Sequence, residues 1–225
     1  MQNSTSILFM LEQGSFWTSL LRGLGVTLYV SAISIVLAFI FGIIFGVMRY
    51  SKVPVVSQIA AVYIEFLRNI PLLLLLFAFF LIGQMQNLTA AIVAMTVFTA
   101  AVVAEVVRGG LNSIPKGQWE AARSQGMSYL QILQHIVLPQ AVTKMIPPMV
   151  SQFVTAIKDS AFAMQLGVLE LLNRAGILRS QFTGTGQLMT IYAVIAVIYF
   201  IVNFILSLAA RRLQKKMSAG SGTIN

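Results

Sequence analysis

Cysteine is absent from the 225-residue chain, and histidine occurs once, as His135. The absence of cysteine excludes a disulfide framework, a thiolate metal site and a cysteine nucleophile. A single histidine argues against a histidine-based metal site or catalytic triad. The phosphate-cradling pattern GxxxxGK(S/T) is also missing, so this chain is not expected to bind a nucleotide through a P-loop. The sequence therefore offers no constellation for catalysis, and we expect no cofactor in this chain.

Charged residues are scarce as well, at 9% of the sequence, whereas 58% is apolar and the mean hydropathy is +0.86. A soluble domain carries about a quarter charged residues, so this composition indicates an integral membrane protein. The net charge of +9 comes from basic clusters between apolar runs, as membrane topology requires. We therefore expect lipid, and no nucleic acid, as a partner. Residues 1–16 lack a basic start followed by an apolar stretch, so no cleavable signal peptide is predicted.

Five segments are long and apolar enough to cross a bilayer core about 30 Å thick. They lie at about 20–48, 58–84, 88–107, 141–166 and 187–210. Because a lipid-exposed backbone must satisfy its own hydrogen bonds, we expect helices throughout and an all-α integral membrane fold. On the first segment, Gly42 and Gly46 form a small-xxx-small spacing, which predicts close contact with another helix.

Lysine and arginine are distributed unevenly between the loops, and this predicts the orientation. With the N-terminus outside and the C-terminus inside, ten basic residues lie on the cytoplasmic side and three outside, in agreement with the positive-inside rule. The cytoplasmic set is Arg49, Lys52, Arg108, Lys116, Arg123, Lys144, Arg211, Arg212, Lys215 and Lys216, and the outer set is Arg22, Arg174 and Arg179. We expect an extracytoplasmic segment 1–19, a transmembrane domain 20–216 and a cytoplasmic polar tail 217–225.

The longest polar stretch between two predicted spans reads NSIPKGQWEAARSQGMSYLQILQHIVLPQ, residues 112–140. Pro115 suits the first turn of a helix, and Gly126 suits a left-handed helix end. Ser128 with Gln131 three residues later predicts a capping box that starts a second helix. Pro139 is expected to break that helix just before the fourth span. The pattern predicts two short helices joined by a tight turn on the cytoplasmic face.

Glu120-Ala-Ala, followed by Gly126 and by Ile136-Val-Leu-Pro139, resembles the EAA loop of ABC importer permeases. The resemblance implies that residues of about 112–139 form a coupling helix in a groove of an ATP-binding subunit. The positions that it assigns to this contact are Gly117, Gln118, Glu120, Ala121, Ala122, Arg123 and Gly126. An ordinary amphipathic linker is the alternative. A DNA-binding helix-turn-helix is excluded because both flanks enter the membrane within a few residues.

Other motifs are similar to the polar amino acid permeases within that family. They are Gly23–Thr27, Glu65–Leu72, Ala104–Gly110 and Ile157–Ser160. The sequence departs from the family pattern at Asn69 and at Ala161-Phe162, which leaves the solute open.

The resemblance implies the type I ABC importer permease fold and import of a polar amino acid, with a glutamine-like or glutamate-like solute favoured. Expected partners are a dimer of ATP-binding cassette subunits holding ATP and Mg²⁺, a second permease copy or homologue, and an extracytoplasmic amino-acid-binding protein. The expected location is the bacterial inner (plasma) membrane, with several spans. Alternatives are a permease for another small polar solute, a secondary transporter or channel, or a membrane scaffold.

Among the charged residues within or near predicted spans, four are informative for substrate: Glu65, Arg68, Lys158 and Asp159. A charge at the bilayer centre costs about 2.5–3.5 kcal/mol on insertion scales, so it normally faces a cavity or a partner. An amino acid offers an ammonium and a carboxylate, and these residues supply both signs. The resemblance links positions matching Glu65 and Asp159 to a solute site, which makes these four residues and Ser160 the candidate substrate contacts.

Three of these charged residues also have a structural interpretation that involves no solute. Glu65 and Arg68 are three residues apart and could pair with each other, and Lys158 could extend toward the interface. The spacing of Glu105 and Arg108 predicts a second structural pair, and His135 is interpreted as a packing residue.

Overall fold

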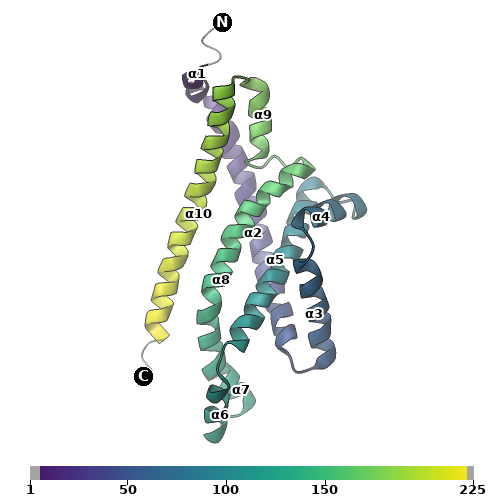
Figure 1. The fold of residues 1–225 in the computed structure, drawn as a ribbon, viewed down its shortest axis with the longest axis vertical. Helices are drawn as coiled ribbons and strands as arrows, with labels where there is room; N and C mark the ends of the chain where they lie inside the picture. The colour runs from purple at the N-terminus through teal and green to yellow at the C-terminus, as the bar shows by residue number, and fades with distance from the viewer. Residues whose placement is uncertain (1–5, 222–225) are drawn as a thin grey trace. The chain divides into compact units, whose positions relative to one another are not determined.

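The computed structural model describes residues 6–221, with side chains described as far as Arg212. Within this range every regular element is a helix (Figure 1), which confirms the all-α prediction. The elements are α1 (Ile7–Glu12), α2 (Gly14–Tyr50), α3 (Pro54–Arg68), α4 (Leu72–Phe77), η2 (Ala78–Ile82), α5 (Asn87–Asn112), α6 (Lys116–Ser124), α7 (Tyr129–Ile132), η3 (Leu133–Val137), α8 (Leu138–Asp159), η4 (Ser160–Leu166), α9 (Asn173–Gln181) and α10 (Thr185–Ser221). Two of these, η2 and η3, are π-helices, and η4 is a 3₁₀-helix.

Among the described residues, α2, α5 and α10 are long and apolar enough to cross a membrane. A fourth span is counted if α3 and the α4–η2 segment, separated by a short break at residues 69–71, are taken as one bent span. The fourth predicted segment, in α8, is not among them. It carries Gln140, Thr143 and Lys144, which lower its mean hydropathy. The count of five spans and the orientation therefore stay predictions.

Contacts divide the chain into two compact units. Unit 1 comprises residues 1–36, 71–96 and 154–205, and unit 2 comprises residues 37–70, 97–153 and 206–225. The divisions fall inside α2, α5, α8 and α10, so each unit combines segments that are far apart in sequence.

The core of unit 1 forms where the first turns of α2, α9 and the start of α10 pack together. Its buried residues are Met10, Phe16, Leu20, Leu171, Ala175, Leu178, Phe182, Ile191 and Ile195. Phe16 meets Phe182 edge to face, with ring centroids 6.3 Å apart. Helix α9 lies within the segment 167–186, between the fourth and fifth predicted spans, where no helix is predicted.

In unit 2, α2 packs closely on α5, as the Gly42 and Gly46 spacing predicts. A Cβ atom on Gly42 would lie 2.4 Å from a Val103 methyl carbon and 3.0 Å from the Ala100 carbonyl oxygen. A Cβ atom on Gly46 would lie 2.8 Å from the Ala104 carbonyl oxygen. Because carbonyl oxygens of the opposite backbone cannot rotate away, both positions require glycine for this approach.

The expectation that Pro139 interrupts the chain is wrong. Helix α7, the π-helix η3 and α8 follow one another without an intervening turn from Tyr129 to Asp159. Pro139 is the second residue of α8, directly after the π-helical segment, and Pro147 and Pro148 also lie inside α8. A proline lacks an N–H donor, but the shift to π-type hydrogen bonding in η3 accommodates its ring and the missing bond.

Candidate functional site

The turn between α6 and α7 has the geometry that its sequence predicts. Gly126 adopts φ +80°, its N–H donates to the Arg123 carbonyl, and the Met127 N–H donates to the Ala122 carbonyl. These two bonds form a Schellman motif, in which a left-handed residue ends the helix. Ser128 and Gln131 then form a reciprocal capping box at the start of α7. The hairpin is thus fixed by local hydrogen bonds.

Most residues of α6 are exposed. Ala122 is 6% exposed and packs in a core cluster with Ile132 and Val137, and Trp119 packs partly against the same cluster. The other positions assigned to the ATPase contact are exposed, namely Gly117, Gln118, Glu120, Ala121, Arg123 and Gly126. Within unit 2, α6 and α7 lie together beyond the C-terminal end of α5 (Figure 1). Helix α6 therefore exposes most of its surface, with small, polar and charged side chains.

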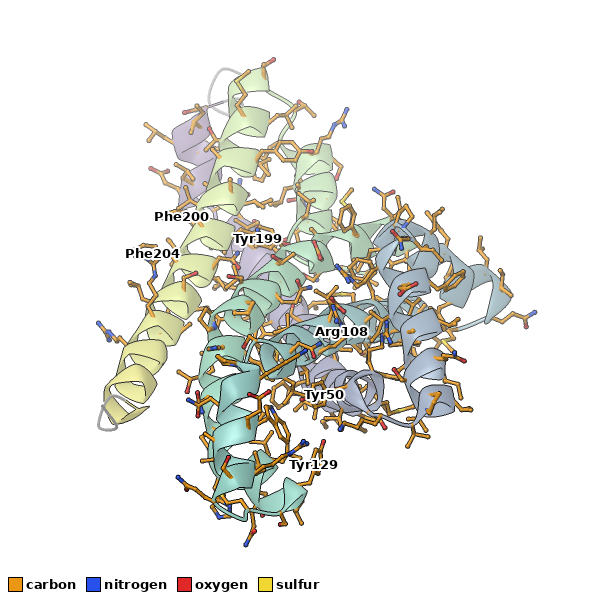
Figure 2. The ribbon with its side chains drawn as sticks, turned by 60° about the horizontal axis from the view of Figure 1, so that its bottom comes forward. Tyr50, Arg108, Tyr129, Tyr199, Phe200 and Phe204 are labelled. Atoms are coloured by element: carbon orange, nitrogen blue, oxygen red, sulfur yellow. The ribbon has the colours of Figure 1, made fainter. Side chains whose placement is uncertain are left out.

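A cavity of about 340 Å³ adjoins α6 in unit 2. Its lining combines three aromatic rings with three cations and one carboxylate: Tyr50, Trp119, Tyr129, Lys52, Lys116, Arg123 and Glu120. Tyr129 lies on the α6–α7 hairpin, where Figure 2 labels it. Trp119 stacks on Tyr129 with ring centroids 5.3 Å apart, and the Lys52 ammonium lies 5.6 Å from the centroid of the Tyr129 ring. The contact ties the chain after α2 to the α6–α7 hairpin.

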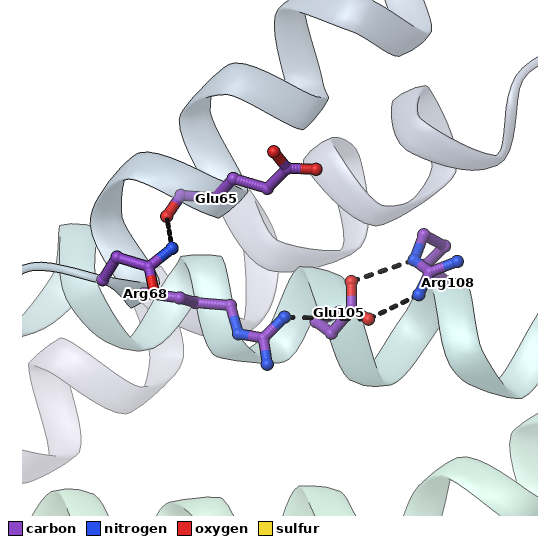
Figure 3. Close-up of polar contacts among 5 residues, drawn as sticks. Glu65, Arg68, Glu105 and Arg108 are labelled. Atoms are coloured by element: carbon purple, nitrogen blue, oxygen red, sulfur yellow. Dashed lines mark hydrogen bonds and ion pairs between the residues drawn. The ribbon is translucent and has the colours of Figure 1, made fainter.

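Three of the charged residues in unit 2 form one cluster (Figure 3). The Glu105 carboxylate accepts two hydrogen bonds from Arg108, one of them from Nε at 2.9 Å, and lies 3.7 Å from Nη1 of Arg68. The predicted Glu105–Arg108 pair is confirmed. The Glu65–Arg68 pair is not formed: Arg68 turns to Glu105, and the Glu65 carboxylate points away from the cluster.

Lys158, Asp159 and Ser160 lie in unit 1, where α8 passes into the 3₁₀-helix η4. The Lys158 side chain is exposed, Asp159 is half-buried, and Ser160 is buried and donates to the Ile157 carbonyl at 2.7 Å. The structure thus brings these three candidate substrate contacts together. Glu65 and Arg68 belong to unit 2.

Glu170, a carboxylate that is completely buried in unit 1, was not among the predicted site residues. It accepts hydrogen bonds from the N–H groups of Leu172 and Asn173 and so caps the start of α9. Burial raises the pKa of the Glu170 carboxyl, because desolvation outweighs the opposing effect of its hydrogen bonds. The sequence signal for this role is an acidic residue three positions before the start of a helix. That signal could not be used, because the residues of α9 show no pattern that predicts a helix.

The chain matches known proteins along most of its length. Residues 38–219 match the family described as binding-protein-dependent transport system inner membrane component. The chain is 48% identical over 201 residues to the probable glutamine ABC transporter permease protein GlnP of Bacillus subtilis, covering 87% of this chain and 92% of that protein. It is 37% identical over 218 residues to the glutamate transport system permease protein GluD of Corynebacterium glutamicum, covering 93% and 79%.

Solved structures agree with these relatives. An amino acid ABC transporter crystallised with histidines matches with a TM-score of 0.85 at 27% identity, covering 94% of this chain and 98% of that one. The inward-facing MetNI methionine ABC transporter matches with a TM-score of 0.73 at 25% identity, covering 91% and 99%. The chain therefore belongs to the binding-protein-dependent transport system inner membrane components, and it has the type I ABC importer permease fold.

Proposed function

We propose that this protein is the permease subunit of an ATP-driven importer for a polar amino acid, with a glutamine-like or glutamate-like solute. The relatives named for glutamine and glutamate transport support the solute class. The observation that carries the coupling role is the exposed face of α6, whose side chains match the positions that the EAA loop assigns to ATPase contact. Its location is the bacterial inner membrane, in keeping with the family description.

In this proposal, a dimer of ATP-binding cassette subunits binds ATP and Mg²⁺ and supplies the hydrolysis. Each α6 sits in a groove of one such subunit, so closure of the dimer on ATP carries the helices together. The membrane helices then open outward to receive the solute from an extracytoplasmic binding protein, and hydrolysis resets them. A second permease copy or homologue completes the pathway. The exposed alanine of α6, Ala121, permits close approach of a partner helix or groove wall, and Glu120 and Arg123 supply charged contacts at its rim.

The coupling role can be tested with Ala121→Trp in the assembled importer. A bulky ring at this exposed position blocks close docking without disturbing the permease core, so we expect binding-protein-stimulated ATPase activity to fall about tenfold or more. Ile205→Trp, an exposed position on α10, is the matched control and should retain stimulation. Full ATPase recruitment and stimulation with Ala121→Trp would show that α6 is not the docking element.

The solute contacts belong to the same proposal. Asp159 and Lys158 supply both signs of charge at the end of α8, and Ser160 follows them. Glu65 makes no ion pair among the described residues, which leaves its carboxylate for an ammonium group. Arg68 is held by Glu105, which favours a structural role for it. Uptake by importers carrying Asp159→Asn or Glu65→Gln tests this assignment, and unchanged uptake by both would remove it.

A further inference from the structure

Glu170 is fully buried, yet both of its carboxylate oxygens have partners in unit 1. Oε2 accepts from the Leu172 N–H at 2.8 Å and from the Tyr199 hydroxyl at 3.0 Å, while Oε1 accepts from the Asn173 N–H. An unpaired carboxylate in an apolar core would cost several kcal/mol, so these bonds are what permits the group to be there. The Tyr199 bond reaches across to α10 (Figure 2), whereas the other two remain in the segment that leads into α9.

The segment that carries Glu170 is itself fixed on α2. The Leu171 N–H donates to Oγ1 of Thr27 at 3.1 Å. A Cβ atom on Gly23 would lie 2.9 Å from Cα of Leu171 and 3.2 Å from the Glu170 carbonyl oxygen, so the two backbones touch. Glu170 therefore has little freedom on the α2 side, and its bond to the hydroxyl sets the position of Tyr199.

Tyr199 in turn lines a cavity of about 400 Å³ in unit 1. The lining is aliphatic apart from two tyrosines and one lysine, and it comprises Lys158, Ala161, Leu172, Tyr192, Ile195, Ala196 and Tyr199. This volume falls in the range of small-molecule sites, about 300–1,000 Å³. Lys158 is the charged residue of the lining and matches the carboxylate that every amino acid carries.

We propose that Glu170 is a positioning residue for solute binding, which acts by holding the Tyr199 ring in the wall of this cavity. The inference rests on the proposed function, because the occupant is the imported polar amino acid with its carboxylate toward Lys158. Glu170 does not touch the solute, since the carboxylate is fully buried and its oxygens are bonded elsewhere. Loss of the bond frees the ring and changes the shape of the cavity, which weakens solute binding.

A double-mutant cycle on uptake tests this proposal. Importers with Glu170→Gln, Tyr199→Phe and both changes are reconstituted with their ATPase and binding protein, and uptake of radiolabelled glutamine and glutamate is measured. Tyr199→Phe removes the donor of this contact, whereas Glu170→Gln replaces the carboxylate with a weaker, neutral acceptor. Tyr199→Phe should therefore raise KM about fivefold or more with kcat within about twofold of wild type, Glu170→Gln should raise KM by less, and the double variant should match Tyr199→Phe. Tyr63→Phe, which removes a tyrosine hydrogen bond to the Val97 carbonyl at 2.8 Å in unit 2, is the matched control and should leave KM unchanged.

Three outcomes would overturn the proposal. The first is a KM of the double variant that rises by the product of the two single fold-increases, because this would mean that the residues act independently. The others are a loss of kcat or thermal stability with KM unchanged, and a wild-type KM for Tyr199→Phe. The last variant keeps the Glu170 cap of α9 and loses one hydroxyl, so it guards against a Glu170→Gln protein that fails to fold. Failure of the proposed function has a separate signature, because the wild-type importer would then take up neither amino acid.

Discussion

Glu105 lies between two arginine side chains, and its single carboxylate serves both. Arg68 comes from the last turn of α3, while Arg108 comes from the same helix as the carboxylate. Charges within membrane-spanning helices are tolerated where they pair. The cluster thus holds the end of α3 against α5 within unit 2, and it accounts for the placement of three charges that have no other partners among the described residues.

Replacing Glu105 with glutamine should destabilise the permease. The amide loses the charge and leaves two guanidinium groups without a counterion, at a cost of about 1–3 kcal/mol in the free energy of unfolding. Thermal unfolding of the purified protein in detergent measures the change. Glu65→Gln is the control and should leave the midpoint unchanged, because Glu65 joins no ion pair in the described part of the chain. Equal midpoints for wild type and Glu105→Gln would contradict the role assigned to the cluster.

At the residue scale, the sequence predicts what depends on near neighbours. The left-handed Gly126 and the Ser128–Gln131 box are determined within four residues of chain, and both are confirmed. The partner of Arg68 could not be predicted from near neighbours, because Arg68 pairs with Glu105 on α5 and not with Glu65, three residues before it on α3. Glu170 was missed for the same reason, since the residue that bonds it across the core, Tyr199, is far away in sequence.

At the scale of helices, the contact between α2 and α5 depends on two glycines one turn apart. Neighbouring valines, Val103 and Val107, fill the space that a side chain on Gly42 or Gly46 would need. Van der Waals packing of this kind is a main source of helix association in a membrane, where lipid tails remove the hydrophobic driving force.

Gly46→Leu should therefore weaken the permease more than its conservative chemistry suggests. The new side chain meets the Ala104 carbonyl oxygen and Val107, and overpacking of this kind costs about 1–3 kcal/mol. The fraction of monodisperse protein after heating measures the loss. Gly25→Leu on the same helix has open space around its Cβ and serves as the control. If both variants resist heating equally, the close approach of α2 and α5 does not contribute to stability.

The sequence predicts the presence of a helix more reliably than it predicts the residues at which the helix begins and ends. Apolar length identified α2, α5 and α10, because a helix of about 20 apolar residues satisfies its own backbone hydrogen bonds in lipid. Pro139 was predicted to end a helix, but the helical segment continues through it. The π-helix η3 directly before it accommodates the missing N–H donor. The break between α3 and α4 divides a segment that is continuous in hydropathy. A hydropathy pattern averages over such breaks and cannot locate them.

At the scale of the whole molecule, the predicted orientation makes α6 cytoplasmic and α9 extracytoplasmic. The natural chain contains no cysteine, so a single introduced thiol reports its own side of the membrane. Ser124→Cys on α6 and Ser180→Cys on α9 are both exposed positions. With a membrane-impermeant maleimide on intact cells, we expect Ser180→Cys to react and Ser124→Cys to react only after the cells are opened. The reverse labelling pattern would show that α6 lies outside the cell, where it could not contact a cytosolic ATPase.

Because Ala122 is the one buried side chain among the nine residues of α6, few packing contacts oppose local opening of this helix. Lys116 and Arg123 lie exposed within it, and trypsin-like proteases cut after such residues once a backbone opens locally. In the proposed importer, a permease made in excess of its ATPase would therefore be cut at this point, while an assembled one would be shielded. Degradation of orphan copies would then keep the amounts of the two subunits matched in the cell.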